Sequence, residues 1–152
     1  MNNNMCSLIS FIVILNFCCI TVCNSHADAP ALEPLRLAVQ DILKAYGEPH
    51  SIVVLGGDAK YHADLKQVLQ ELDREFTQDG THIGEKDGFY WDRNSKKSAV
   101  NLMIYELKKT SSTWKIGVYA QVAGTAGEGR NYIVKQAGGK WKIIRKDTGG
   151  VS

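Results

Sequence analysis

The sequence predicts an α+β domain in which two N-terminal helices pack on a curved antiparallel sheet of at least four strands. Three observations favour this class. In two early segments apolar residues recur every three or four positions, which is the period of a helix that buries one face. From Ser98 onward the apolar period shortens to two, as in strands. Helices followed by strands that short turns connect are typical of α+β folds.

The first predicted helix covers residues 34–46. Pro34 suits its first turn, and Gly47 followed by Pro49 indicates its end. The next segment, 52–55, is apolar and rich in β-branched residues. Four residues do not decide between a short buried strand and an apolar linker.

The second predicted helix covers residues 59–77. Asp58 is a suitable N-cap, and apolar positions continue at helical spacing from Tyr61 to Phe76. The glycines that follow indicate a loop over residues 80–88, which leads into an aromatic triplet at 89–91.

Four strands are predicted in the rest of the chain: 99–107, 113–123, 130–136 and 140–146. The segments between them have the length and the turn residues of hairpin connections. These connections are 108–112, 124–129 and 137–139.

The first 27 residues differ from the rest, because they contain all four cysteines and no Lys, Arg, Asp or Glu. The apolar run 8–22 is shorter than the span of about 20 residues that a membrane helix needs, and small residues at Ser25 and Ala27 fit a cleavage site. We predict a signal peptide over 1–27 and a single domain over 28–152, exported to the periplasm or secreted. The lack of a basic residue near the start leaves a lipid-anchored form and an uncleaved anchor open.

Several kinds of site are not expected in the predicted domain. It has no cysteine for a disulfide, a zinc site or a thiol nucleophile. Its histidines, His50, His62 and His82, are far apart in the sequence, so we expect no metal. His62 and Asp64 point to different sides of the second helix and do not form an acid–base pair. We therefore expect no catalytic residues and no cofactor.

The charges are nearly balanced, with a net charge of +2. The densest basic segment is Lys135–Lys146. We interpret it as a solvated sheet face, with a contact face for an acidic protein partner as the alternative. Nucleic acid is not expected as a partner, because its binding proteins carry a clustered basic surface.

Two segments are candidates for protein recognition. The glycine-rich stretch with Gly127, Glu128, Gly129 and Arg130 is predicted as a projecting loop whose arginine pairs with a partner carboxylate. A flexible hairpin loop is the alternative for it. The second segment is the aromatic triplet with its flanking arginine, in which core packing is the alternative to an exposed contact patch. Its candidate contact residues are Tyr90, Trp91 and Arg93.

The ending Gly138–Arg145, with Lys140 and Trp141 after the turn glycines, resembles the last hairpin of the NTF2-like (cystatin-like) superfamily. The plan of two helices and a meander is similar over about residues 32–146. This resemblance implies a cone-like fold with a pocket between helices and sheet, and dimers through the sheet. The superfamily contains enzymes, pocket binders and immunity proteins, so the fold does not choose a function.

We expect an exported, non-enzymatic protein-binding module of the inhibitor or immunity type. The alternative is an NTF2-like small-molecule binder or an isomerase or hydrolase. That alternative requires a deep polar pocket that holds an acid with a raised pKa. A homodimer stays open, and no stable membrane span is expected after cleavage.

Overall fold

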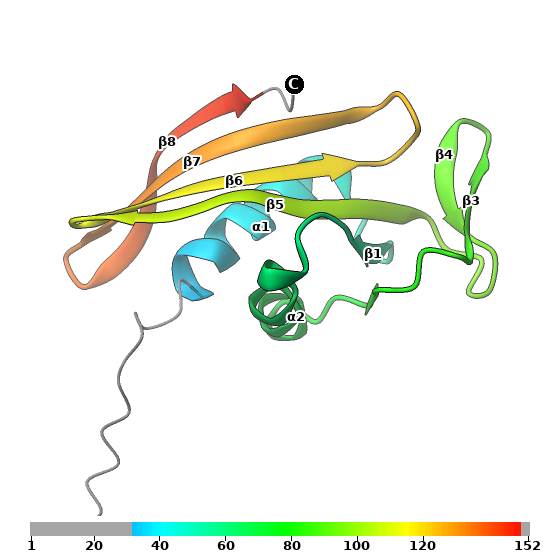
Figure 1. Cartoon of the computed structure of the whole chain (residues 1–152), viewed down its shortest axis with the longest axis horizontal. Helices are drawn as coiled ribbons and strands as arrows, with labels where there is room; N and C mark the ends of the chain where they lie inside the picture. The colour runs from blue at the N-terminus through cyan, green and yellow to red at the C-terminus, as the bar shows by residue number, and fades with distance from the viewer. Residues whose placement is uncertain (1–31, 150–152) are drawn as a thin grey trace, which may run out of the picture.

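Helix α1 (Leu32–Tyr46) opens the part of the chain that the computed structural model describes, residues 32–149. The predicted signal peptide lies outside these residues. After α1 come strand β1 (Ile52–Leu55), a 3-10 turn η1 (Ala59–Tyr61) and helix α2 (His62–Glu71) (Figure 1). The strands that follow are β2 (Phe76–Thr77), β3 (Ile83–Lys86), β4 (Phe89–Asp92), β5 (Ala99–Thr110), β6 (Thr113–Gln121), β7 (Gly127–Ala137) and β8 (Lys140–Gly149).

The predicted α+β class is confirmed, but the sheet is mixed and has six strands. Their order is β2-β1-β5-β6-β7-β8. Strand β1 runs parallel to both of its neighbours, β2 and β5, whereas β5 to β8 form the antiparallel meander that the alternating pattern predicted. The segment 52–55 is therefore a strand, and three of its four residues are buried.

The second helix is six residues shorter at its C-terminal end than predicted. It ends at Glu71, and Asp73 has a φ of 52°, in the left-handed region that stops a helix. Phe76, predicted to lie on the apolar face of this helix, lies instead in β2 and pairs with Val53. Phe76 continues the helical spacing of α2 only by coincidence, because it belongs to β2 and pairs with β1.

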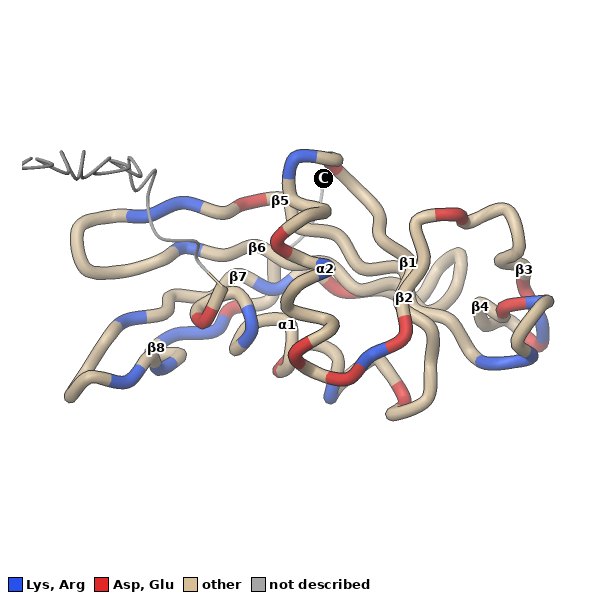
Figure 2. Tube along the Cα trace, turned by 90° about the horizontal axis from the view of Figure 1, so that it is seen from below, with Lys and Arg blue, Asp and Glu red and all other residues tan. Residues whose placement is uncertain are grey.

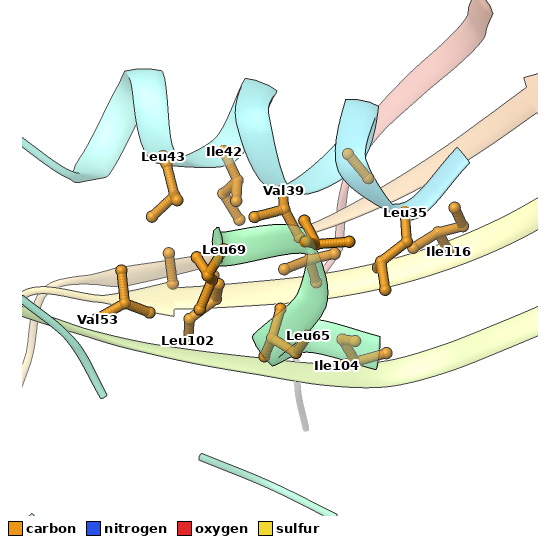
Figure 3. Close-up of a cluster of buried hydrophobic side chains, with 14 of the residues drawn as sticks. Leu35, Val39, Ile42, Leu43, Val53, Leu65, Leu69, Leu102, Ile104 and Ile116 are labelled. Atoms are coloured by element: carbon orange, nitrogen blue, oxygen red, sulfur yellow. The ribbon is translucent and has the colours of Figure 1, made fainter. Parts of the chain in front are cut away.

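Both helices pack on one face of the sheet and fill the space against it with apolar side chains. Figure 3 shows leucines and isoleucines from α1 and α2 pointing at the residues of β5 and β6. The core includes Leu35, Val39, Ile42, Leu65, Leu69, Leu102, Ile104 and Ile116, each exposed by less than 5%. No cone-shaped cavity separates helices and sheet in this described core, because its centre is occupied by these side chains.

On the opposite face of the sheet, glycines let tyrosines lie flat on the strands. A Cβ on Gly117 would stand 2.2 Å from the ring of Tyr105, whose hydroxyl donates to Asn131 Oδ1 at 2.9 Å. A Cβ on Gly129 would lie 2.3 Å from the carbonyl oxygen of Gly149 on the next strand. These glycines are needed because other atoms already occupy the place of a side chain.

Candidate functional site

The β3–β4 hairpin projects beside the six-stranded sheet and is not a member of it (Figure 1). Its turn is Asp87-Gly88, with φ of 54° and 83°, as a type I′ turn requires. The segment 80–88, predicted as a loop, therefore contains a strand. The Asp-Gly pair between Lys86 and Phe89 was the local signal for it.

Two backbone contacts fix the hairpin to the body of the domain, and a third set of hydrogen bonds orders its base. The backbone N–H of Tyr90 donates to the carbonyl of Val122 at 2.6 Å, and Trp91 forms an isolated bridge with Ser98. At the base, buried Asp92 accepts from the hydroxyl of Ser95 at 2.6 Å and from two backbone N–H groups of its own loop. These hydrogen bonds, that of Ser95 first, lower the pKa of Asp92.

A cleft of about 490 Å³ lies between this hairpin, the C-terminal end of α1 and the start of β5. Its wall is mostly apolar and aromatic, and Phe89 at its mouth is 58% exposed. The ammonium of Lys86 stands 5.0 Å from the centre of the Trp91 ring. We call this site the aromatic cleft; its lining includes Ala45, Tyr46, Phe89, Tyr90, Trp91 and Val122.

Tyr46 forms part of one wall of the cleft, and contacts with charged side chains hold it in place. Its hydroxyl donates to Glu128, and the guanidinium of Arg130 lies 5.4 Å from its ring centre. Arg130 in turn donates to Glu128 at 2.8 Å and to Asp41 at 3.1 Å. We call these groups, with Tyr132 and Lys146, the Asp41 cluster.

The Asp41 carboxylate joins α1 to the last two strands. It accepts from the hydroxyl of fully buried Tyr132 at 2.9 Å and from Lys146 at 3.1 Å, besides Arg130. Burial disfavours its charged form, but these hydrogen bonds outweigh burial and hold the pKa of Asp41 below its ordinary value of 3.8. Burial and the hydrogen bond to Asp41 raise the pKa of Tyr132.

Glu128 is ionised for the same kind of reason. The hydrogen bonds from Tyr46 and from Arg130 lower the pKa of Glu128. Donation to that carboxylate raises the pKa of Tyr46. Both acids of the cluster are thus charged near neutral pH and have their donors in place, which suits a structural tie between helix and sheet.

The connection predicted over residues 124–129 has other bounds in the structure. The loop covers only residues 122–126, and Gly127 begins strand β7, where it pairs with Gln121. Gly127 and Gly129 are strand positions that give room to neighbouring strands and tyrosines. The Arg130 side chain is 15% exposed and is paired with Asp41 and Glu128 of the same domain.

The aromatic candidates lie at one site. Tyr90 and Trp91 line the aromatic cleft, whereas Arg93 is exposed and its guanidinium lies against Gly84 on the adjacent strand, outside the lining. Tyr46 is a residue of the cleft that was not among the predicted candidates. Its position in the last turn of the helix is what brings it to the cleft.

The histidines have local partners. His62 Nδ1 lies 2.9 Å from Gln78 Nε2, and its Nε2 lies 3.2 Å from the carbonyl of Gly56, so the ring ties α2 to two loops. No hydrogen bond joins His62 to Asp64 in the described residues. His82 lies 3.4 Å from Asp79, and His50 is exposed.

Over residues 32–149, no group of three or more His, Cys, Asp or Glu side chains could hold a metal ion. Neither described helix is long and apolar enough to cross a membrane. Comparison with protein-family models, curated proteins and solved structures finds no match for this chain.

Proposed function

We propose that this chain is an exported, non-enzymatic protein-binding module and that the aromatic cleft is its contact site. The observation that carries the proposal is Phe89, a large apolar side chain that is 58% exposed at the mouth of a cleft walled by Tyr90 and Trp91. Aromatic side chains in a concave, partly dry site are the usual anchors of protein interfaces. An inhibitor or immunity-type protein would use such a site to bind its target.

The arrangement of acids favours binding over proton-transfer catalysis. The space between helices and sheet is filled by Leu, Ile and Val side chains, and the acids Asp41 and Glu128 have lowered rather than raised pKa values. A general acid that works near neutral pH needs the opposite shift. The NTF2-like assignment stays a proposal, supported by two helices packed on one sheet face, although the filled interior departs from the pocket that the resemblance implies.

The test is to capture a partner and then vary the cleft. The purified protein is incubated with envelope and secreted fractions of its source cells, and the captured protein is identified by mass and expressed. We expect Phe89→Ala to weaken binding of that partner about tenfold or more, as a hot-spot residue does. Ile144→Ala is the matched control, because Ile144 is 56% exposed but lies on β8.

Two results would contradict the proposal. Equal affinities of the Phe89→Ala variant and the unchanged protein would exclude the cleft as the contact site. A loss confined to the Ile144→Ala variant would move the interface to the far edge of the sheet.

A small-molecule binder remains the second candidate, and the cleft volume favours it, because about 490 Å³ lies in the range of ligand pockets. The discriminating measurement is a thermal-shift screen with apolar and aromatic ligands. A ligand that raises the melting temperature of the protein but not of a Trp91→Ala variant would favour a pocket binder over a protein-binding module.

Export is a separate proposal. It is supported by the uncharged, apolar first 27 residues, which lie outside the described chain. N-terminal sequencing of the protein from the cells that make it should find Asp28 or a near neighbour first. A start at Met1, or a lipid-modified cysteine, would contradict cleavage at the predicted site.

A further inference from the structure

Four lysines from four adjacent strands lie at one end of the sheet. The register places Lys108 of β5 directly opposite Lys115 of β6, and Lys135 of β7 directly opposite Lys142 of β8. All four are exposed. We call this set the lysine face. Figure 2 shows Lys and Arg gathered along β8 and at the neighbouring ends of β5 and β6, at the other end of the sheet from the β3–β4 hairpin.

The lysine face lacks the carboxylates that accompany cations elsewhere in the domain. Among residues 32–149, none of the four lysines forms an ion pair, whereas Arg145 of the same face has Asp147 at 2.6 Å. Like charges directly opposite each other on neighbouring strands destabilise a sheet. Two such pairs therefore cost stability, and within residues 32–149 no ion pair of these lysines offsets that cost.

Protection of the sheet edge explains only part of this pattern. Lysines on an edge strand prevent a second chain from pairing there, and β8 is an edge strand that carries Lys142. The part of β5 that carries Lys108 is also an edge, because β1 pairs with β5 only over Ala99–Leu102. Lys115 and Lys135, however, lie on β6 and β7, which have strands on both sides there. Their placement opposite Lys108 and Lys142 calls for an anion from outside the chain.

We propose that the lysine face binds an acidic segment of a protein partner. Strands are spaced about 4.8 Å apart, so four of them present cations over about 15 Å, which an extended segment of four or five residues spans. Glu106 on β5 and Asp147 on β8 limit the positive surface in the other direction, along the strands. A short run of carboxylates fits this footprint, whereas a nucleic acid or a lipid surface would continue across the acids. The lysine face and the aromatic cleft have no residue in common. Variants of one site therefore test its proposal without changing the other site.

The experiment uses the protein purified from cells that express the full chain and a fluorescent octaglutamate peptide, with an octaserine peptide as the neutral probe. We expect anisotropy to show binding of octaglutamate alone, weakening as salt rises from about 50 to about 200 mM. The variant Lys115→Gln/Lys135→Gln should bind about tenfold more weakly. The variant Lys60→Gln/Lys97→Gln removes the same charge from lysines that already have acid partners, and should bind like the unchanged protein.

Several outcomes would overturn the proposal. Equal losses in the two double variants would show that net charge alone attracts the peptide. Tighter binding of an oligothymidylate or of phosphatidylglycerol vesicles than of octaglutamate would assign the face to nucleic acid or to a membrane. Loss of octaglutamate binding in the Phe89→Ala variant would place the acidic segment at the aromatic cleft. The Lys115→Gln/Lys135→Gln variant should melt at or above the temperature of the unchanged protein. This measurement shows that a loss of binding does not come from a loss of folding.

Discussion

The Asp41 cluster should make the stability of the domain depend on one half-buried carboxylate. Asp41→Asn keeps the shape of the side chain and removes its charge. The hydrogen bond from buried Tyr132 to the ionised acceptor contributes about 1.5–3 kcal/mol, and a neutral one about 1 kcal/mol. The ion pairs with Arg130 and Lys146 are partly open to solvent, since the Asp41 side chain is 28% exposed, and each contributes at most about 1 kcal/mol after screening.

Together these differences predict that Asp41→Asn lowers the free energy of unfolding by about 2 kcal/mol at pH 7. For a domain of this size the melting temperature should fall by about 8 °C. The assay is thermal and urea unfolding followed by circular dichroism. Asp64→Asn is the control, because Asp64 has no hydrogen-bond or ion-pair partner within residues 32–149 and its charge in the first turn of α2 contributes less than about 1 kcal/mol.

The pH dependence of stability is a second test of the stabilising role of Asp41. Because the pKa of Asp41 is lower in the folded state, its contribution is present above the ordinary value of 3.8 and disappears as pH falls through the lowered value. The unchanged protein should therefore lose more stability than Asp41→Asn between about pH 5 and pH 2. Equal melting temperatures at pH 7, or parallel pH profiles, would refute the view that this cluster stabilises the domain.

Three further outcomes follow from the packing. Gly129→Ala should lower the free energy of unfolding by about 1–3 kcal/mol, measured by urea titration, because its Cβ would meet the backbone oxygen of Gly149 and not a movable side chain; an unchanged midpoint would contradict the close approach of β7 and β8. Lys115→Gln should raise it by about 0.2–1 kcal/mol in the same titration, since it removes the repulsion from Lys108; a loss of stability would show an unseen role for the charge. Phe89→Ser should shift the thermal midpoint by less than about 2 °C, because an exposed side chain contributes little to folding; a large drop would mean that Phe89 packs as core.

Local patterns predicted the elements well where one period held over many residues. The apolar stripe of α1 and the alternation in β5, β6 and β8 identified those elements to within a few residues at most of their ends. The mixed sheet could not be predicted, because the pairing of Ile52 with Ala99 joins strands 47 positions apart, and no local signal encodes it. The same limit explains Phe76, whose helical spacing competed with a distant strand partner.

The candidate site was predictable in its residue types but not in its geometry. Tyr90 and Trp91 were expected to serve recognition, and they do line the cleft. Glu128 and Arg130 were expected to face a partner because glycines surrounded them. The sequence does not show that Gly129 is required by a neighbouring backbone, or that Asp41, 89 positions away, engages the arginine.

The pairing of the first described helix with the last strands bears on when the chain can fold. Helix α1 packs on β6, β7 and β8, and Asp41 meets Lys146 across 105 positions. A chain that emerges N-terminus first, from a ribosome or through a membrane pore, therefore cannot close its core until nearly its last residue is free. Such dominance of distant contacts slows folding. Until those strands are available, α1 lacks the sheet face that buries its apolar side chains.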